Sequence, residues 1–325
     1  MNRQYFYWPI LAAAIGGTFI LALSIGPVRI SFLSLSDTDK IILLNLRLPR
    51  SISAFLVGGG LALAGAIFQG LFRNPIADSY LLGVSSGASL GAAAAIVLKL
   101  ASPLGNFAAV SFFAFFGALI ALALVFYCAG RNGTFSIFRL LLSGLGVGLF
   151  LSSLVAVFML MAGEELKALI FFFLGGFSSS SWDTTWVALA CVPLAVFIAW
   201  YFAPDLNVLL LGEESAESSG VRTDRIQLLY AVLAALLTSI AVSVAGLIGF
   251  VGLIVPHMIR LVSGSDHRTM LPLTFFAGGI FLVLCDTAAR TLLAPVELPV
   301  GIVTSLVGVP IFLYLIRNQA DDQGW

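Results

Sequence analysis

Long apolar segments separated by short polar stretches recur from one end of the chain to the other. They fall at about residues 7–27, 52–70, 81–98, 107–129, 140–162, 184–203, 226–246, 248–262, 271–289 and 300–317. Their usual length is about 20 residues, which is what an α-helix needs to cross about 30 Å of hydrocarbon. The pattern therefore predicts an all-α, polytopic membrane protein with about ten transmembrane helices.

Two features interrupt this regular pattern. The apolar run 168–177 is too short to cross a bilayer, so we expect a re-entrant or interfacial helix. The seventh and eighth segments meet at residues 246–249, which leave room only for a tight turn.

Residues 64–67 resemble residues 245–248, and a proline follows each stretch at the same offset. A duplicated half and chance similarity in a Gly/Ala-rich chain explain this faint repeat equally well.

Composition agrees with the membrane prediction and excludes other classes. The chain is 60% hydrophobic and 10% charged, whereas soluble domains carry about 25% charged residues. A net charge of zero gives no indication of nucleic-acid binding. We expect one transmembrane domain over residues 1–325, with an uncleaved first helix. Cys128, Cys191 and Cys285 are isolated in apolar runs, and the pattern predicts no metal site.

The basic residues between the segments favour a cytoplasmic N-terminus, and hence a cytoplasmic C-terminus, by a small margin. Nine of the 16 fall on the predicted inner side and seven on the outer side. Without Arg47, Arg50 and Arg290 the outer number would be 7 − 3 = 4. These three arginines run against the positive-inside rule, so they need another explanation, such as a partner protein that carries carboxylates.

Intramembrane charges usually mark function. Asp286 and Arg290 lie one helical turn apart, so a local ion pair is one interpretation. Presentation of the Arg290 guanidinium at the outer surface is another. In the polar loop 204–225, leucines mix with acidic residues between 209 and 220. This mixture favours a short helix that docks on another protein, and a solvated loop is the alternative.

No motif for catalysis is present. A Walker A loop needs Gly-Lys followed by Ser or Thr, and the only lysines, Lys40, Lys99 and Lys167, do not follow glycine. We therefore expect no enzymatic activity on this chain, and any ATPase would be a separate subunit. The two histidines, His257 and His267, both lie near a predicted cytoplasmic loop, and His257, which follows Pro256, is interpreted as a capping or packing residue.

Several motifs follow one another in order along nearly the whole chain and are similar to those of the FecCD family. They are Arg47-Leu-Pro-Arg50, Gly65-Ala-Ile-Phe-Gln69, Arg73-Asn-Pro-Ile-Ala-Asp78, Leu82-Gly-Val-Ser-Ser-Gly87, Arg139-Leu-Leu-Leu-Ser-Gly144, Leu174-Gly-Gly-Phe177, Gly249-Phe-Val-Gly-Leu-Ile-Val-Pro-His257, Asp286-Thr-Ala-Ala-Arg290 and Glu297-Leu-Pro-Val-Gly301. The members of this family are the permease subunits of type II ABC importers for iron–siderophores, haem and cobalamin.

The resemblance implies a type II importer permease in a bacterial or archaeal cell (inner) membrane. It implies a second permease copy, identical or paralogous, and two ATP-binding subunits that hold ATP and Mg. A periplasmic or lipid-anchored substrate-binding protein completes the assembly, and this chain itself holds no cofactor. The cargo would be a metal chelate. Residues 136–138 are bulkier than the small hydroxyl residues of cobalamin permeases, which ranks an iron–siderophore or haem before cobalamin.

The resemblance also assigns roles to individual residues. Arg47, Arg50 and Arg290 would receive glutamates of the binding protein. Asn74, Pro75, Ile137 and Phe138 would form a gate on the translocation path. The ATPase coupling segment would be Leu211, Gly212, Glu213, Glu214, Ser215, Ala216, Glu217, Ser218, Ser219, Gly220 and Val221. The alternative function is a gradient-driven secondary transporter or channel that needs no ATPase.

Overall fold

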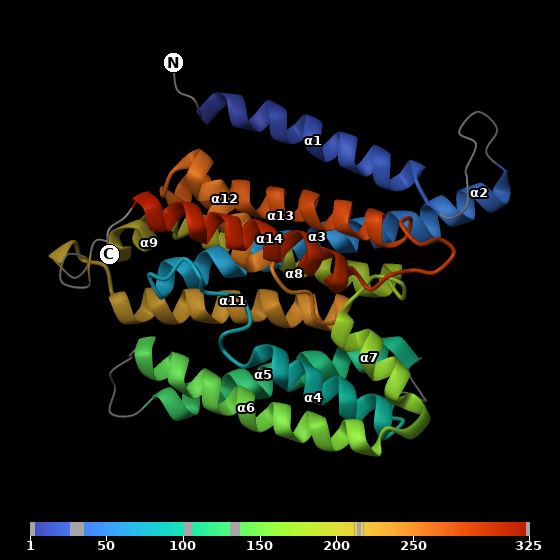
Figure 1. Cartoon of the computed structure of the whole chain (residues 1–325). Helices are drawn as coiled ribbons and strands as arrows, with labels where there is room; N and C mark the ends of the chain where they lie inside the picture. The colour runs from blue at the N-terminus through green and yellow to red at the C-terminus, as the bar shows by residue number, and fades with distance from the viewer. Residues whose placement is uncertain are drawn as a thin grey trace.

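The long helices run back and forth between two ends of the molecule (Figure 1). The computed structural model describes residues 4–26, 36–100, 106–130, 137–210, 212, 216 and 218–322. Helices suit a bilayer because each one satisfies its own backbone N–H and C=O groups. The predicted all-α fold is confirmed.

The elements follow in this order: α1 (Gln4–Ser24), α2 (Asp37–Ile41), the π-helical turn η1 (Ile42–Arg47), α3 (Leu48–Leu71), α4 (Val84–Val97), α5 (Asn106–Ala129), α6 (Ile137–Met161), the 3₁₀ turn η2 (Gly163–Glu165), α7 (Leu166–Leu174), α8 (Trp182–Tyr201), α9 (Ala203–Leu210), α11 (Thr223–Ala245), α12 (Val251–Ser263), α13 (His267–Ala289) and α14 (Val300–Asp322). Within the described ranges, seven helices are long and apolar enough to cross a membrane. Three shorter apolar helices lie in α4, α12 and α14. The count of about ten spans stays a prediction.

The two interruptions of the apolar pattern have structural counterparts. The short run corresponds to α7, a helix of nine residues that ends at Leu174 and has Gly175 as its C-cap. α11 ends at Ala245 and α12 begins at Val251, so the tight turn between them is confirmed. The internal repeat has no common structure, because residues 64–67 lie inside the continuous helix α3 whereas residues 245–248 lie at this turn.

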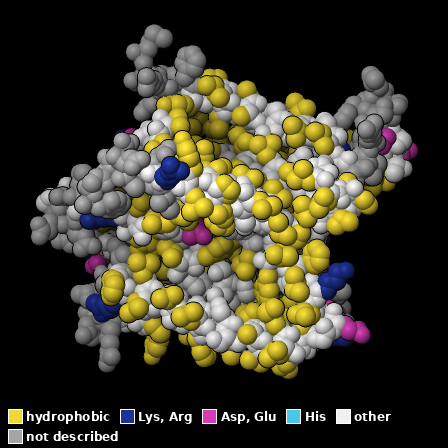
Figure 2. Space-filling model, viewed as in Figure 1, with side chains coloured by type: hydrophobic (Ala, Val, Ile, Leu, Met, Phe, Trp, Pro, Cys, Tyr) yellow, Lys and Arg dark blue, Asp and Glu magenta, His cyan; other side chains and the backbone are white. Residues whose placement is uncertain are grey.

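Polar and apolar parts of the molecule are separated along the helices. The start of α1, the end of α14 and α9 lie at one end, which we call the α9 end (Figure 1). α2, α7 and the loop between α13 and α14 lie at the opposite end, the α2 end. The face shown in Figure 2 is mostly apolar, and its few charged side chains lie mainly toward the two ends. This distribution fits a protein surrounded by lipid.

α3 is the central helix, with nearly all of its residues buried. Pro49 stands in its first turn, where a missing N–H does no harm. α3 packs against α13 where Gly58 faces Gly278, and against α12 where Gly65 faces Gly252. A Cβ atom on Gly65 would overlap the Gly252 carbonyl. Small residues thus let these helix backbones touch, as expected for helix packing in lipid.

We predict that Gly65→Ala destabilises the protein, because the added methyl group must push α3 away from α12. Overpacking of this kind costs about 1–3 kcal/mol. Gly60→Ala is the matched control in the same helix, since a Cβ there lies 3.6 Å from its nearest neighbour, Leu237. Thermal unfolding in detergent should show a lower midpoint for Gly65→Ala and an unchanged or higher one for Gly60→Ala. Equal midpoints would contradict the packing described here.

Candidate functional site

Arg50 forms ion pairs with two carboxylates at the α2 end, those of Asp286 and Glu297. Its Nε donates to both carboxylate oxygens of Asp286, at 3.0 and 3.1 Å, and its Nη2 donates to Asp286 Oδ1 at 2.9 Å. Its Nη1 donates to Glu297 Oε2 at 3.0 Å and to Oε1 at 3.2 Å. One guanidinium therefore joins α3, α13 and the loop before α14 through two carboxylates.

The two carboxylates differ in their access to water. The Asp286 side chain is 1% exposed and that of Glu297 is 37% exposed, while that of Arg50 is 12% exposed. Asp286 is thus a buried counterion, and Glu297 is a peripheral one. Local pairing of Asp286 with Arg290 is a secondary contact, because the Arg290 Nε lies 3.8 Å from Asp286 Oδ2. The sequence interpretation of Asp286 therefore identified a weaker partner, and the main one comes from 236 residues away.

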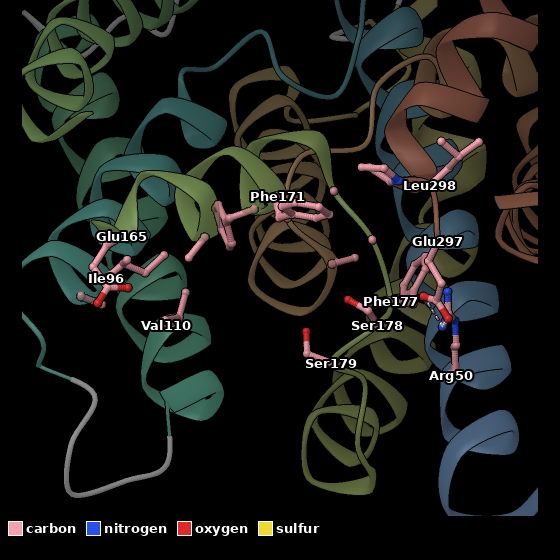
Figure 3. A pocket seen from close by; sticks show the side chains of 18 of the residues that line it. Arg50, Ile96, Val110, Glu165, Phe171, Phe177, Ser178, Ser179, Glu297 and Leu298 are labelled. Atoms are coloured by element: carbon pink, nitrogen blue, oxygen red, sulfur yellow. Dashed lines mark hydrogen bonds and ion pairs between the residues drawn. The ribbon is translucent and has the colours of Figure 1, made fainter. Parts of the chain in front are cut away.

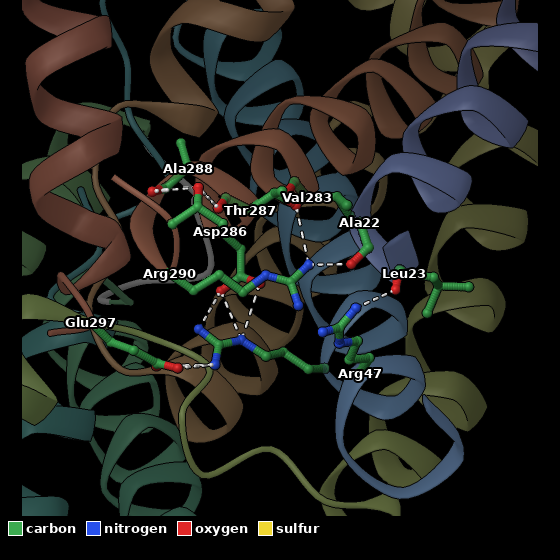
Figure 4. Close-up of polar contacts among 11 residues, drawn as sticks. Ala22, Leu23, Arg47, Val283, Asp286, Thr287, Ala288, Arg290 and Glu297 are labelled. Atoms are coloured by element: carbon green, nitrogen blue, oxygen red, sulfur yellow. Dashed lines mark hydrogen bonds and ion pairs between the residues drawn. The ribbon is translucent and has the colours of Figure 1, made fainter. Parts of the chain in front are cut away.

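Arg47 and Arg290 hold the last turn of α1. Arg47 Nη1 donates to the carbonyls of Leu23 and Ser24, and Arg290 Nη2 donates to that of Ala22 (Figure 4). These carbonyls have no partner within the helix, and they form the negative end of its dipole. Two positive charges therefore attach an otherwise largely exposed helix to the bundle.

The burial of these two arginines corrects one expectation. Arg290 does not present its guanidinium at the surface, because it is 3% exposed, and Arg47 is 4% exposed. The Arg50 guanidinium, by contrast, binds the partly exposed carboxylate of Glu297. Docking through Arg47, Arg50 and Arg290 stays a prediction, and the geometry favours Arg50 as the residue that a partner reaches first.

A cavity of about 720 Å³ opens beside this network (Figure 3). Arg50 and Glu297 form part of one side, Glu165 and Ile96 lie on the other, and Phe171 projects between them. The remaining lining residues are mostly apolar or small: Ala95, Val110, Ala168, Phe172, Gly175, Gly176, Phe177, Ser178, Ser179, Ala245, Gly246, Leu298 and Pro299, together with Lys99. Its volume is in the range of about 300–1,000 Å³ that is usual for ligand pockets.

Three turns meet backbone to backbone at the wall of this cavity. The Gly176 N–H donates to the Ala245 carbonyl at 2.8 Å, and the Val300 N–H donates to the Gly175 carbonyl at 2.9 Å. Tyr80 fixes the turn between α11 and α12, since its hydroxyl donates to the Ile248 carbonyl and accepts from the Ile248 N–H. These hydrogen bonds hold the cavity wall together and pair polar backbone groups of the turns, as an apolar setting requires.

At the α9 end, α9 is attached to α3 and to α13. Arg73, in the loop after α3, has a left-handed φ of 49° and donates from Nη2 to the Leu209 carbonyl at 2.8 Å. On α9, the Asn207 amide donates to Asp266 Oδ1 at 2.7 Å, and its oxygen accepts from the backbone N–H and Nδ1 of His267. Any displacement of α9 would therefore act on the end of α3 and the start of α13.

His267 is a buried residue at the start of α13. It is 1% exposed, and because the Asn207 oxygen can only accept, Nδ1 must carry the proton. Its Nε2 is buried without a hydrogen-bond partner and faces Gly70 of α3. Among the described residues, no group of three or more His, Cys, Asp or Glu could hold a metal ion.

The predicted gate and coupling residues are placed only in part. Asn74 is exposed, and its side chain accepts from the Ile76 N–H at 3.0 Å in the loop that also holds Pro75. Ile137 begins α6, and Phe138 beside it is 73% exposed. In the coupling segment, Leu211, Glu213, Glu214, Ser215 and Glu217 lie outside the described residues.

The described coupling residues lie directly after α9. The Ala216 N–H donates to the Gly212 carbonyl at 3.0 Å, which forms one helical turn, and Ala216 is buried. Ser218 follows in helical conformation, and Ser219, Gly220 and Val221 help to line a hollow of about 550 Å³ beside Arg222 and Arg225. The roles of all these gate and coupling residues stay predictions.

Sequence reasoning missed four residues that organise the two ends: Glu297, Asn207, Tyr80 and Gln69. Gln69 donates to the carbonyls of Ala77, Gly252 and Leu253 from within buried α3. Gln69 and Glu297 lie within the motifs described above. The motifs alone do not predict which groups these two side chains contact. A polar residue within an apolar segment was the available signal for Gln69, whereas Asn207 and Tyr80 lie in loops or short helices.

The fold defines the class of protein. A solved structure described as an inward-facing conformation of a metal-chelate-type ABC transporter superposes with a TM-score of 0.89 and 30% identity. The match covers 97% of this chain and 99% of that one. The chain thus has the fold of a type II ABC importer permease, and it is a multi-pass membrane protein. The FecCD transport family matches residues 11–318, and the chain belongs to this family.

Several characterised or named relatives are similar over most of their length. A cobalamin import system permease, BtuC, of Halobacterium salinarum is 44% identical over 87% of this chain and 75% of its own. A haemin transport system permease, HmuU, of Yersinia pestis is 38% identical over 97% of this chain and 94% of its own. An uncharacterised ABC transporter permease, YvrB, of Bacillus subtilis is 40% identical over 86% of this chain and 79% of its own.

We predict that Asp286→Asn strongly destabilises the protein, because it leaves Arg50 and Arg290 without their buried counterion. Removal of one partner of a buried ion pair costs about 3–5 kcal/mol. Glu297→Gln is the comparison, and as a partly exposed pair its loss costs about 1 kcal/mol or less. The measurement is the yield and the unfolding midpoint of each variant in detergent. A similar midpoint for both variants would show that burial does not set the strength of these pairs.

Proposed function

We propose that this chain is the transmembrane subunit of an ATP-driven importer for a metal chelate. The observation that carries the proposal is the full-length match to the FecCD family and to a metal-chelate-type transporter of the same fold. In the assembly, two copies of the permease, or this chain and a paralogue, would bind two ATPase subunits that hold ATP and Mg. A substrate-binding protein would deliver the cargo.

The two ends of the molecule fit two different partners, the ATPase and the substrate-binding protein. We infer that the α9 end faces the cytoplasm and binds the ATPase through residues 211–221, with both termini on the same side. The α2 end would then receive the binding protein. The weak excess of basic residues on the α9 side agrees with this orientation.

Motion would pass from the ATPase through α9. Because Asn207 ties α9 to α13 and Arg73 ties it to α3, a shift of α9 would move both helices together. α3 continues into the loop of Asn74 and Pro75, the proposed gate segment. α13 carries Asp286 and Arg290 at its other end, so it would connect the ATPase side with the docking side.

The names of the relatives support a bulky chelate as cargo: a cobalamin system and a haemin system are both among them. Large apolar residues near the proposed gate, such as the exposed Phe138, favour haem or an iron–siderophore over cobalamin. A gradient-driven carrier is the other candidate, but the family match favours the ATP-driven one.

Reconstitution in liposomes tests the proposal. The permease is incorporated with the ATPase and binding protein of its own gene cluster, and uptake of haemin, a ferric siderophore and cobalamin is measured with and without ATP. We expect uptake of one of them only with all components and ATP. Uptake by the permease alone, driven by an ion gradient, would overturn the proposal.

We predict that Asn207→Ala uncouples ATP hydrolysis from uptake, because it removes the link between α9 and α13. Three hydrogen bonds are lost, each worth about 1 kcal/mol. The reconstituted complex should hydrolyse ATP at a rate near that of the wild type while uptake falls severalfold. Asn45→Ala, an equivalent change at the exposed α2 end, is the control. Unchanged uptake with Asn207→Ala would exclude this route for the motion.

A further inference from the structure

Arg50 divides its hydrogen-bond donors between a buried partner and an accessible one. Nε and Nη2 form the edge that binds Asp286, which is 1% exposed. Among the described residues, Nη1 donates only to Glu297, whose side chain is 37% exposed. The guanidinium therefore has one edge fixed inside the protein and one edge at the border with solvent.

The hydrogen bonds at the two edges of the guanidinium differ in the free energy that it would take to break them. Separation of Arg50 from Asp286 would leave a buried carboxylate with only the 3.8 Å contact to Arg290, which is strongly unfavourable. Separation from Glu297 leaves Arg50 neutralised by Asp286, and the freed carboxylate can be hydrated because it is partly exposed. Exposed ion pairs contribute little to stability. The Nη1 edge can therefore exchange its carboxylate while the bundle stays intact.

The surroundings of Glu297 make it accessible to a large partner. Its loop also exposes Leu292, Leu293 and Val296, which are 66%, 57% and 65% exposed. Glu297 and Arg50 both line the rim of the 720 Å³ cavity. A protein that covers this loop would reach the Arg50–Glu297 pair directly.

We propose that Glu297 is an exchangeable counterion: it occupies the outer edge of Arg50 in the unbound permease, and a carboxylate of the docking protein replaces it there. This inference rests on the proposed function, in which the binding protein docks at the α2 end, and on the expectation from the sequence that its carboxylates meet Arg50. Glu297 then weakens docking in two ways, by competition for Nη1 and by repulsion of the incoming carboxylate. The permease thus sets its own affinity for the binding protein.

The test compares the affinity of the purified binding protein for the permease–ATPase complex in nanodiscs. We expect Glu297→Gln and Glu297→Ala to tighten binding about fivefold, the ratio that corresponds to an exposed ion pair worth about 1 kcal/mol. Glu165→Gln is the matched control, because Glu165 lines the same cavity, is 41% exposed and pairs with Lys99 instead. The control should leave the affinity unchanged.

The outcomes separate this inference from the proposed function. Weaker or unchanged binding with both Glu297 variants would overturn it, and so would equal tightening with Glu165→Gln, which would indicate a general charge effect. Arg50→Lys keeps the charge but loses the second edge of the guanidinium, so it should weaken docking and reduce the effect of Glu297→Gln. Docking that is insensitive to Arg50→Lys would instead refute the proposed docking site. Unfolding midpoints near that of the wild type confirm that the Glu297 variants are folded.

Discussion

The buried ion pair between Arg50 and Asp286 is the interaction on which the α2 end of this protein depends. A guanidinium in an apolar bundle is tolerated only with a close counterion, and Asp286 provides it from a helix distant in sequence. The other contacts at this end surround this pair. Arg290 lies beside Asp286, Glu297 binds the outer edge of Arg50, and Arg47 and Arg290 donate to the last carbonyls of α1.

The same two helices that form the ion pair are connected to α9 at the other end. α3 ends in the loop that contains Arg73, and α13 begins with the residues that bind Asn207. Between the ends, α3 and α13 touch through Gly58 and Gly278, where neither helix has a side chain to keep them apart. A close-packed pair of this kind moves as one body, because there is no free volume in which either helix could shift alone. This gives the proposed ATPase contact at the α9 end and the proposed docking site at the α2 end a physical connection.

At the α2 end lies a cavity, and three irregular turns meet at its wall. Irregular backbone is costly inside a membrane unless its polar groups are paired. Here the Val300 N–H donates to Gly175, the Gly176 N–H donates to Ala245, and the Tyr80 hydroxyl pairs with Ile248. The turns and the ion pair meet at the rim, where Glu297 and Pro299 lie close in sequence to Val300. The Arg50–Glu297 pair and the cavity wall are therefore parts of one connected region.

The helical elements were predictable because each depends on local hydropathy over a single stretch of chain. The short α7, the turn between α11 and α12 and the small-residue contacts of α3 all follow from length and residue size. The family was also recognisable, since its motifs lie in order along the chain. The partner of Asp286 was not predictable, because i,i+4 spacing pointed to Arg290 while the shorter contact is with Arg50.

The sequence by itself determined that this is an all-α membrane protein of the FecCD family, with scarce charges gathered at helix ends. Hydropathy and motif order carry that information without reference to contacts. Only the tertiary structure decided which carboxylate each arginine meets, that Arg47 and Arg290 are buried against α1, and that Arg50 keeps one accessible edge. The reason is that ion pairing and burial depend on distances between segments up to 268 residues apart, and those distances exist only once the helices have packed.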